Sequence, residues 1–177
     1  MKTEYEFRIL EINKEKMIKK LEKLGAKKVG EFNQKRYVYD VQPKQENKWI
    51  RLRTNGATTT LTYKSIKSDT INGTKEIEIE VSDFEKTNEL LEKMGYKNKG
   101  YQENNRIQYI LNNTEIDIDT WPMIPTYMEI EGKSEEEVIQ TSKILNVDES
   151  KITMLNCKDI YEEKYGIDID TIKELKF

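Results

Sequence analysis

Charged and apolar residues alternate with a period of two in several separate stretches of this chain. Five of these stretches read EYEFR from residue 4, WIRLR from 49, KEIEIEV from 75, EIDID from 115 and YMEIE from 127. Such alternation places successive side chains on opposite faces of a β-strand. We therefore predict eight strands, most with one charged and one apolar face. They span approximately residues 3–12, 29–41, 47–54, 58–67, 73–82, 98–111, 114–120 and 126–132.

Three further segments repeat their apolar residues with helical spacing, at residues 14–24, 83–94 and 134–145. Ser134 precedes Glu137 by three positions, which is the pattern of a helix capping box. A shorter helix is predicted near residues 158–165. The pattern therefore describes a mixture of strands and helices.

The sequence also repeats itself. Residues 21–39 align with residues 91–109 at an offset of 70, with identical residues at eight positions that include two glycines and an arginine. A strand–helix–strand unit thus occurs twice, and its strand–helix part recurs at 127–145. This repeat predicts one pseudo-symmetric domain over residues 1–177, with a helical C-terminal segment at about 155–177.

Composition limits the functional classes. Charged residues make up 36% of the chain, yet the net charge is only −3. We expect no nucleic-acid partner, because nucleic-acid binding usually shows as a strong basic excess. The apolar runs are too short for a membrane span, and the N-terminus is charged from Lys2 onward, so we expect neither a membrane partner nor a signal peptide. The single cysteine, Cys157, excludes an internal disulfide and predicts a reducing, cytoplasmic location.

The chain has no histidine. This excludes histidine as a general base or metal ligand, so a metal site must be built from carboxylates, which favour magnesium, manganese or calcium. The charged strand faces allow two arrangements. An open sheet would expose them to water, whereas eight strands closed into a barrel would turn them inward. Because unpaired buried charge is costly, a closed barrel of this kind fits a wet site that binds both cations and an anion. A polyphosphate with a divalent metal meets that demand.

EYEFR resembles the ExExK signature of CYTH domain proteins, the triphosphate tunnel metalloenzyme superfamily. The later motifs are similar in order as well: WIRLR, TLTYK, NNRIQY and EIDIDTWPMIPTYMEIEG, so that the resemblance covers about residues 1–160. The family includes class IV adenylyl cyclases, thiamine triphosphatases and inorganic tripolyphosphatases. The resemblance implies an α+β fold with an eight-stranded antiparallel closed β-barrel, a tunnel with a charged interior and helices packed outside. It further implies a metal-binding, phosphate-binding site that uses Mg²⁺ or Mn²⁺.

The family's site residues carry over position by position. The implied metal ligands are Glu4, Glu6, Asp117, Glu129 and Glu131, and Asp119 is added because strand alternation points its side chain the same way. The implied substrate-binding residues are Arg51, Arg53, Lys64 and Arg106, with Arg36 added as the repeat partner of Arg106 and Lys158 as a base on the C-terminal segment. The catalytic candidates are Glu4, Glu6 and Arg8. Two roles are predicted equally for Glu76, Glu78 and Glu80: pairing with the arginines in support of the site, or belonging to the site itself. We interpret Trp49, Trp121 and Cys157 as packing residues.

Two positions depart from the family pattern. Arg8 stands where the signature has lysine, which keeps the charge but loses the compact ammonium group. Asn104 stands where many members have a further base. Fewer cations imply weaker binding or a different substrate.

These features predict a metal-dependent enzyme that hydrolyses a small-molecule triphosphate: tripolyphosphate, ATP or another nucleoside triphosphate, or thiamine triphosphate. Two alternatives stay open. One is an adenylate cyclase that converts ATP to cyclic AMP and pyrophosphate. The other is a non-catalytic module that binds polyphosphate or nucleotide. The protein is expected to be a monomer or a homodimer.

Overall fold

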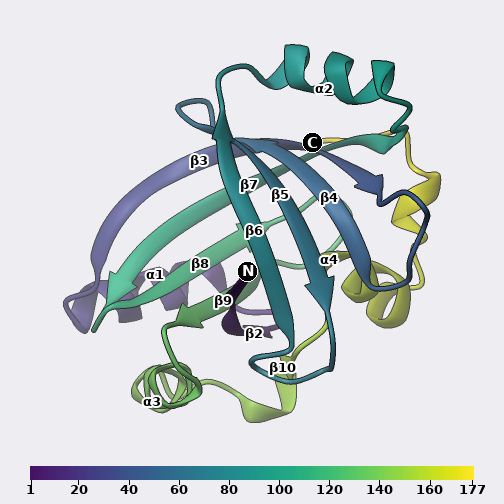
Figure 1. The fold of residues 1–177 in the computed structure, drawn as a ribbon. Coiled ribbons are helices and arrows are strands. Elements are labelled where there is room, and N and C mark those ends of the chain that lie inside the picture. The colour runs from purple at the N-terminus through teal and green to yellow at the C-terminus, as the bar shows by residue number, and fades with distance from the viewer.

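A single curled β-sheet dominates the fold (Figure 1). The structure is a computed structural model that describes all 177 residues. The strands are β1 (Lys2–Thr3), β2 (Tyr5–Ile9), β3 (Lys27–Asp40), β4 (Lys48–Thr54), β5 (Thr59–Ile66), β6 (Thr74–Val81), β7 (Asn98–Leu111), β8 (Thr114–Thr120), β9 (Tyr127–Gly132), β10 (Ile152–Thr153) and β11 (Glu174–Leu175). Their order in the sheet is β1-β6-β5-β4-β3-β7-β8-β9-β2-β10, and β11 pairs with β7.

The N-terminal segment joins the two ends of this strand order. β1 pairs with β6, so that Lys2 lies opposite Glu76, and β2 pairs with β9 along its whole length. Between them, the Glu4 amide donates to the Thr74 carbonyl at 3.0 Å. The curled sheet therefore encloses an interior, although only two residue pairs link β1 to β6.

The predicted α+β fold with a mainly antiparallel sheet is confirmed, but the sheet is curled and does not match the predicted closed eight-stranded barrel exactly, since the strand order is an open path. The strand count differs from the predicted eight. β1 and β2 divide the first predicted strand, and the C-terminal segment adds two short strands, of which β11 runs parallel to β7. Two-residue strands carry no periodicity, which is why the alternation pattern did not indicate them.

The three predicted helices are present as α1 (Lys14–Lys23), α2 (Phe84–Lys93) and α3 (Glu135–Ile144). Each begins at a side-chain cap, namely Asn13, Asp83 and Ser134, whose side-chain oxygens accept amide hydrogen bonds from the first turn. In the C-terminal segment, the short α4 (Cys157–Asp159) continues into a π-helical turn at Ile160–Lys164. Two 3₁₀ turns lie at Glu149–Lys151 and Ile169–Thr171. No helix is long and apolar enough to cross a membrane.

The apolar strand faces point outward, and most of them are covered by helices or by the C-terminal segment; the outer face of β6, with Ile77 and Ile79, stays exposed. Leu21 of α1 and Val138 of α3 pack with Phe7, Ile116 and Ile130 in the largest apolar core. Leu91 of α2 packs with Tyr39 and Leu52 in a smaller one. The C-terminal segment forms a third cluster, in which Ile160, Tyr161 and Ile169 pack with Trp121. Because these contacts fix the apolar faces outside, the alternating charged side chains must face the interior.

Candidate functional site

The interior of the curled sheet is lined almost entirely by charged and polar side chains. Seven charged residues that face it are buried: Glu4, Glu6, Arg8, Lys64, Asp117, Asp119 and Glu129. A cavity of about 240 Å³ remains between them, and only two of its sixteen lining residues are hydrophobic. Such a concentration of buried charge is costly unless opposite charges or ligands balance it.

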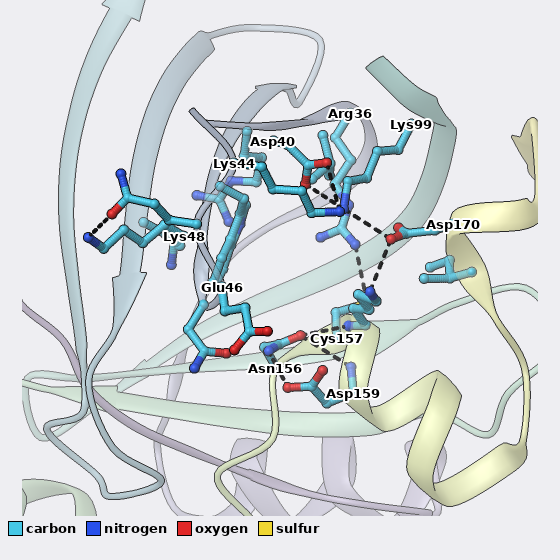
Figure 2. Close-up of a pocket in the computed structure, with 18 of the residues that line it drawn as sticks. Arg36, Asp40, Lys44, Glu46, Lys48, Lys99, Asn156, Cys157, Asp159 and Asp170 are labelled. Carbon is cyan, nitrogen blue, oxygen red and sulfur yellow. Dashed lines mark hydrogen bonds and ion pairs between the residues drawn. The ribbon is translucent and has the colours of Figure 1, made fainter. Parts of the chain in front are cut away.

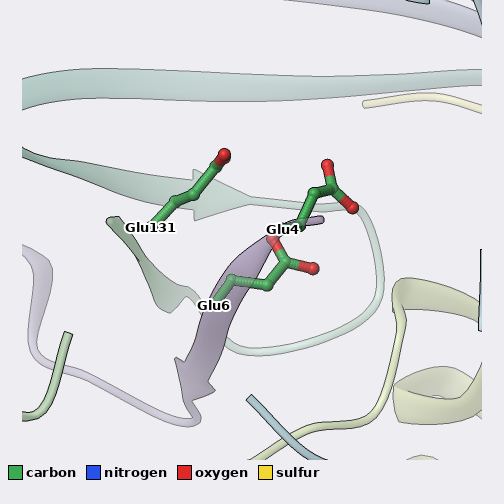
Figure 3. Close-up of side chains that lie close together, drawn as sticks. All are labelled: Glu4, Glu6 and Glu131. Atoms are coloured by element: carbon green, nitrogen blue, oxygen red, sulfur yellow. The ribbon is translucent and has the colours of Figure 1, made fainter. Parts of the chain in front are cut away.

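Three glutamates converge on one side of this cavity (Figure 3). Glu4 and Glu6 come from the N-terminal segment, and Glu131 comes from β9, where it lies directly opposite Glu6. One carboxylate oxygen from each lies within 4.8 Å of the others. Three convergent carboxylates are the donor set that hard divalent cations such as Mg²⁺ and Mn²⁺ prefer. The residues therefore fit the metal that the resemblance implies.

Each of the three glutamates contacts a cation of the protein. Lys64 Nζ lies 2.7 Å from Glu4, Arg8 Nη2 lies 2.9 Å from Glu6, and Lys2 Nζ lies 3.0 Å from Glu131. Burial nevertheless raises the pKa of all three carboxyl groups. The protein's own cations thus balance the acidic charge only partly.

Glu129 lies apart from this trio. Its carboxylate is 2.5 Å from Arg8 Nη2 and 3.8 Å from Arg106 Nη2. Burial opposes the ionisation of Glu129, but Arg8 and Arg106 outweigh burial and lower its pKa to about 2. Glu129 is therefore held as a carboxylate between two guanidinium groups.

Asp117 and Asp119, two of the predicted metal ligands, surround Arg106. Arg106 Nε and Nη2 donate to the two oxygens of Asp119 at 2.9 and 2.6 Å, and Nη1 donates to Asp117. Asn104 also donates to Asp119, at 3.1 Å. The structure thus places both aspartates outside the three-glutamate cluster, where they fix the orientation of Arg106.

The predicted phosphate-binding residues differ in how they are paired. Arg51 donates to Glu78 at 3.2 Å, and Lys64 lies between Glu4 and Glu76. Arg53 has no ion pair and no side-chain hydrogen bond, and its side chain lines the same cavity as the glutamates. Burial, together with the nearby cations of Arg51 and Arg106, lowers the pKa of Arg53 to about 9. Arg53 is therefore a half-buried cation whose surroundings favour an anion.

Arg36 and Lys158 belong to the other end of the interior, where a second cavity of about 440 Å³ opens (Figure 2). The Arg36 guanidinium lies 4.2 Å from the centre of the Trp121 ring, and its Nη2 donates to Cys157 Sγ at 3.2 Å. Lys158 pairs with Asp170 at 3.0 Å. Arg36, Arg51 and Lys64 line both cavities, whereas Lys158 lines only the second.

Sequence reasoning missed several residues of this interior. Lys2, which pairs with Glu131, continues the alternation two positions before Glu4, and this signal was available. Trp121 packs in the third apolar cluster, as the sequence predicts, and it also lines the first cavity and stacks against Arg36. The Leu155 carbonyl accepts a hydrogen bond from Arg8 Nη1 at 3.1 Å, and no pattern in the chain indicates that long-range contact.

Comparison with known proteins supports the resemblance found in the motifs. The CYTH domain family model matches residues 2–154. A protein of Methanocaldococcus jannaschii, provisionally named an adenylate cyclase, is 26% identical over 166 residues, which cover 84% of this chain and 93% of that protein.

Solved structures agree with this match. A protein of Pyrococcus horikoshii superposes with a TM-score of 0.76 at 26% identity, covering 86% of this chain and 96% of that chain. A Hippeastrum protein superposes with a TM-score of 0.60 at 13% identity, covering 94% and 96% of the two chains. Its structure is titled as that of a provisional adenylyl cyclase with a dominant triphosphatase activity. At that identity, the similarity establishes the fold alone.

Proposed function

Because the chain belongs to the CYTH domain family, we propose that it is an enzyme that hydrolyses a triphosphate with the help of Mg²⁺ or Mn²⁺. The observation that carries the proposal is the opposition of charges across one cavity. The unpaired Arg53 lines it together with the Glu4, Glu6 and Glu131 cluster. A phosphate chain supplies the anion that Arg53 lacks, and a divalent ion supplies the positive charge that Lys2, Arg8 and Lys64 provide to the glutamates only in part.

The basic and acidic side chains of the cavity have different roles. Arg53 and Arg51 bind phosphate oxygens, since a guanidinium group donates two parallel hydrogen bonds to such oxygens. Glu4, Glu6 and Glu131 hold the metal. A bound divalent ion supplies charge neutralisation at the phosphate oxygens and lowers the pKa of a bound water. Because phosphoryl transfer depends mainly on positioning and on charge stabilisation, this arrangement suits hydrolysis of the terminal phosphate.

A second candidate function is cyclisation of ATP to cyclic AMP and pyrophosphate. The 440 Å³ cavity favours it, because it adjoins the first through Arg36, Arg51 and Lys64 and offers space for a nucleoside at the end of the phosphate chain. The name of the Methanocaldococcus relative points the same way. Thiamine triphosphate also has a head group, so the cavity alone favours substrates larger than tripolyphosphate without selecting one.

The decisive experiment is an assay of products. Purified protein is incubated with Mg²⁺ or Mn²⁺ and with ATP, tripolyphosphate or thiamine triphosphate, and the products are separated. Orthophosphate supports hydrolysis, and cyclic AMP with pyrophosphate supports the cyclase. Tight binding with no product over hours would instead support a non-catalytic module and contradict both enzymes.

Two variants and a control link that activity to the site. Arg53→Gln and Glu6→Gln are each expected to lose roughly a hundredfold in rate, as is typical when one charge-stabilising group is removed from an active site. Lys19→Gln removes a charge from the exposed face of α1 and is expected to retain full activity. Equal rates in all four proteins would show that the activity arises elsewhere.

We further propose that residues 1–177 form one domain, because strands from both ends of the chain join the same sheet. The monomer or homodimer and the cytoplasmic location stay predictions from the sequence.

A further inference from the structure

Arg8, the residue that departs from the family signature, lies among the glutamates predicted to bind metal. Its side chain is only 11% exposed. Nη2 lies 2.9 Å from Glu6 and 2.5 Å from Glu129, and Nη1 donates to the Leu155 carbonyl at 3.1 Å. Nε is buried and has no hydrogen-bond partner. The guanidinium group thus bridges two carboxylates and is tethered to the C-terminal segment.

This bridge divides the predicted ligand set in two. Glu4, Glu6 and Glu131 converge within 4.8 Å, whereas Glu129 is held by Arg8 and Arg106 and does not join them. The guanidinium group of an arginine stays charged at any physiological pH. The cation between Glu6 and Glu129 is therefore permanent.

A fixed cation at this place affects metal binding directly. A divalent ion bridging Glu6 and Glu129 needs oxygen atoms that already accept hydrogen bonds from Arg8. It also meets the repulsion of a guanidinium charge at close range in a partly desolvated site. An ion bound by Glu4, Glu6 and Glu131 competes with the Lys64 and Lys2 contacts on Glu4 and Glu131. At Glu6 it can use the carboxylate oxygen that accepts no hydrogen bond from Arg8.

We propose that the Arg8 guanidinium takes the place of a second divalent ion, so that this chain binds one ion, at Glu4, Glu6 and Glu131. Arg8 is then a positioning residue that fixes Glu6 and Glu129 by a charge built into the protein. The inference rests on the metal dependence in the proposed function, and its test uses the metal alone, without substrate.

Arginine suits this place better than lysine. A guanidinium presents several donors in a planar fork, and here one nitrogen contacts two carboxylates while another reaches the Leu155 carbonyl. A lysine ammonium is a single point of charge on a flexible stem. The substitution at position 8 therefore exchanges a mobile cation for one held at three points.

The test counts bound Mn²⁺ by electron paramagnetic resonance of the free ion, at neutral pH and without substrate. The wild type is expected to bind one ion, and Glu131→Gln is expected to lose it. Arg8→Gln is expected to gain a second site, because Glu129 and one oxygen of Glu6 lose their contact with the Arg8 cation. Arg51→Gln is the matched control. It removes the same charge from the interior of the sheet, but next to Glu78, and is expected to keep the count at one.

The possible results separate the two proposals. Two ions in the wild type would overturn the role of Arg8 and leave the metal-dependent function standing. One ion in folded Arg8→Gln, checked by circular dichroism, would also overturn it. No ion in the wild type would remove the metal site and with it the metal dependence of the proposed function. If Arg8→Gln does not fold, Arg8→Met takes its place, since it keeps much of the side-chain volume without the charge and is expected to bind two ions. One ion in folded Arg8→Met would overturn the role of Arg8.

Discussion

At the scale of single residues, the same strand pattern produces cations with very different surroundings. Arg8 and Arg106 are each held by two or more acidic side chains, whereas Arg53 has none. Alternation in the sequence predicts that all three face the interior. It does not reveal which carboxylate each one meets, because that depends on sheet register and curvature. The unpaired Arg53 is the residue that the structure singles out for an anion.

Loss of Arg53 is expected to weaken ATP binding and to stabilise the empty protein. A hydrogen-bonded charge contributes roughly 1.5–3 kcal/mol, so Arg53→Gln is expected to lose about tenfold to a hundredfold in ATP affinity, measured by calorimetry in EDTA. The folded-state pKa of Arg53, about 9, lies below its ordinary value. Folding therefore penalises the charged Arg53 side chain at pH 7. Arg53→Gln removes that charge and is expected to unfold at a higher urea concentration than the wild type at pH 7. An unchanged affinity would remove Arg53 from the site.

At the scale of elements, the C-terminal segment closes one end of the interior. Ile160 and Tyr161 are fully buried against Trp121, and the Tyr161 hydroxyl donates to the Pro122 carbonyl at 2.6 Å. The sequence predicted a short helix near 158–165 and nothing of β10 or β11. Their pairing follows from contacts over long sequence distances, which local periodicity does not encode.

Truncation of a buried apolar side chain in this segment is expected to destabilise the whole protein. Ile160→Ala removes a fully buried side chain and is expected to cost about 2–5 kcal/mol of unfolding free energy, measured by urea denaturation. Ile77→Ala makes the same chemical change on the outer face of β6, where Ile77 is 52% exposed, and is expected to cost much less. Similar losses in both variants would mean that the segment contributes no more than a surface strand.

At the scale of the whole molecule, the internal repeat explains the arrangement of the site. Gln34 of β3 lies opposite Asn104 of β7, and these two residues are repeat partners at the offset of 70. A pseudo-twofold axis therefore passes between them. It relates Arg36 to Arg106 and sends them toward opposite ends of the interior, one near Cys157 and one near Asp117.

The sequence predicted this architecture well, because alternation and helical spacing are local and strong here. The strand predicted at 98–111 coincides with β7, and each predicted helix is found within one residue at either end. The separation of the predicted acidic ligands was not predictable. Glu131 joins Glu4 and Glu6, while Glu129, two residues away on the same face, turns to Arg8. In the pairing of β2 with β9, Glu131 lies directly opposite Glu6 and Glu129 directly opposite Arg8. That register joins segments far apart in the chain, and the alternation pattern does not encode it.

Burying the charged side chains of the interior costs free energy of folding when no ligand is bound. Burial raises the pKa of the three clustered glutamates and lowers that of Arg53, so folding disfavours the charged forms of both sets. A bound cation lowers this cost for the glutamates, and a bound anion lowers it for Arg53. A metal ion also reduces the repulsion between the glutamates and a phosphate chain. Metal and triphosphate are therefore expected to stabilise the fold cooperatively.

Thermal unfolding tests this coupling. A ligand at a hundred times its Kd adds about 2.7 kcal/mol, which corresponds to roughly 5–10 °C for a domain of this size. Mn²⁺ and tripolyphosphate together, at matched free concentrations, are expected to raise the unfolding temperature by more than the sum of their separate shifts. Glu6→Gln should lose the Mn²⁺ increment and Arg53→Gln the tripolyphosphate increment, and each variant should lose the excess. Additive shifts in the wild type would mean that the two ligands bind independently. Shifts of unchanged size in the variants would mean that Mn²⁺ and tripolyphosphate bind outside this cavity.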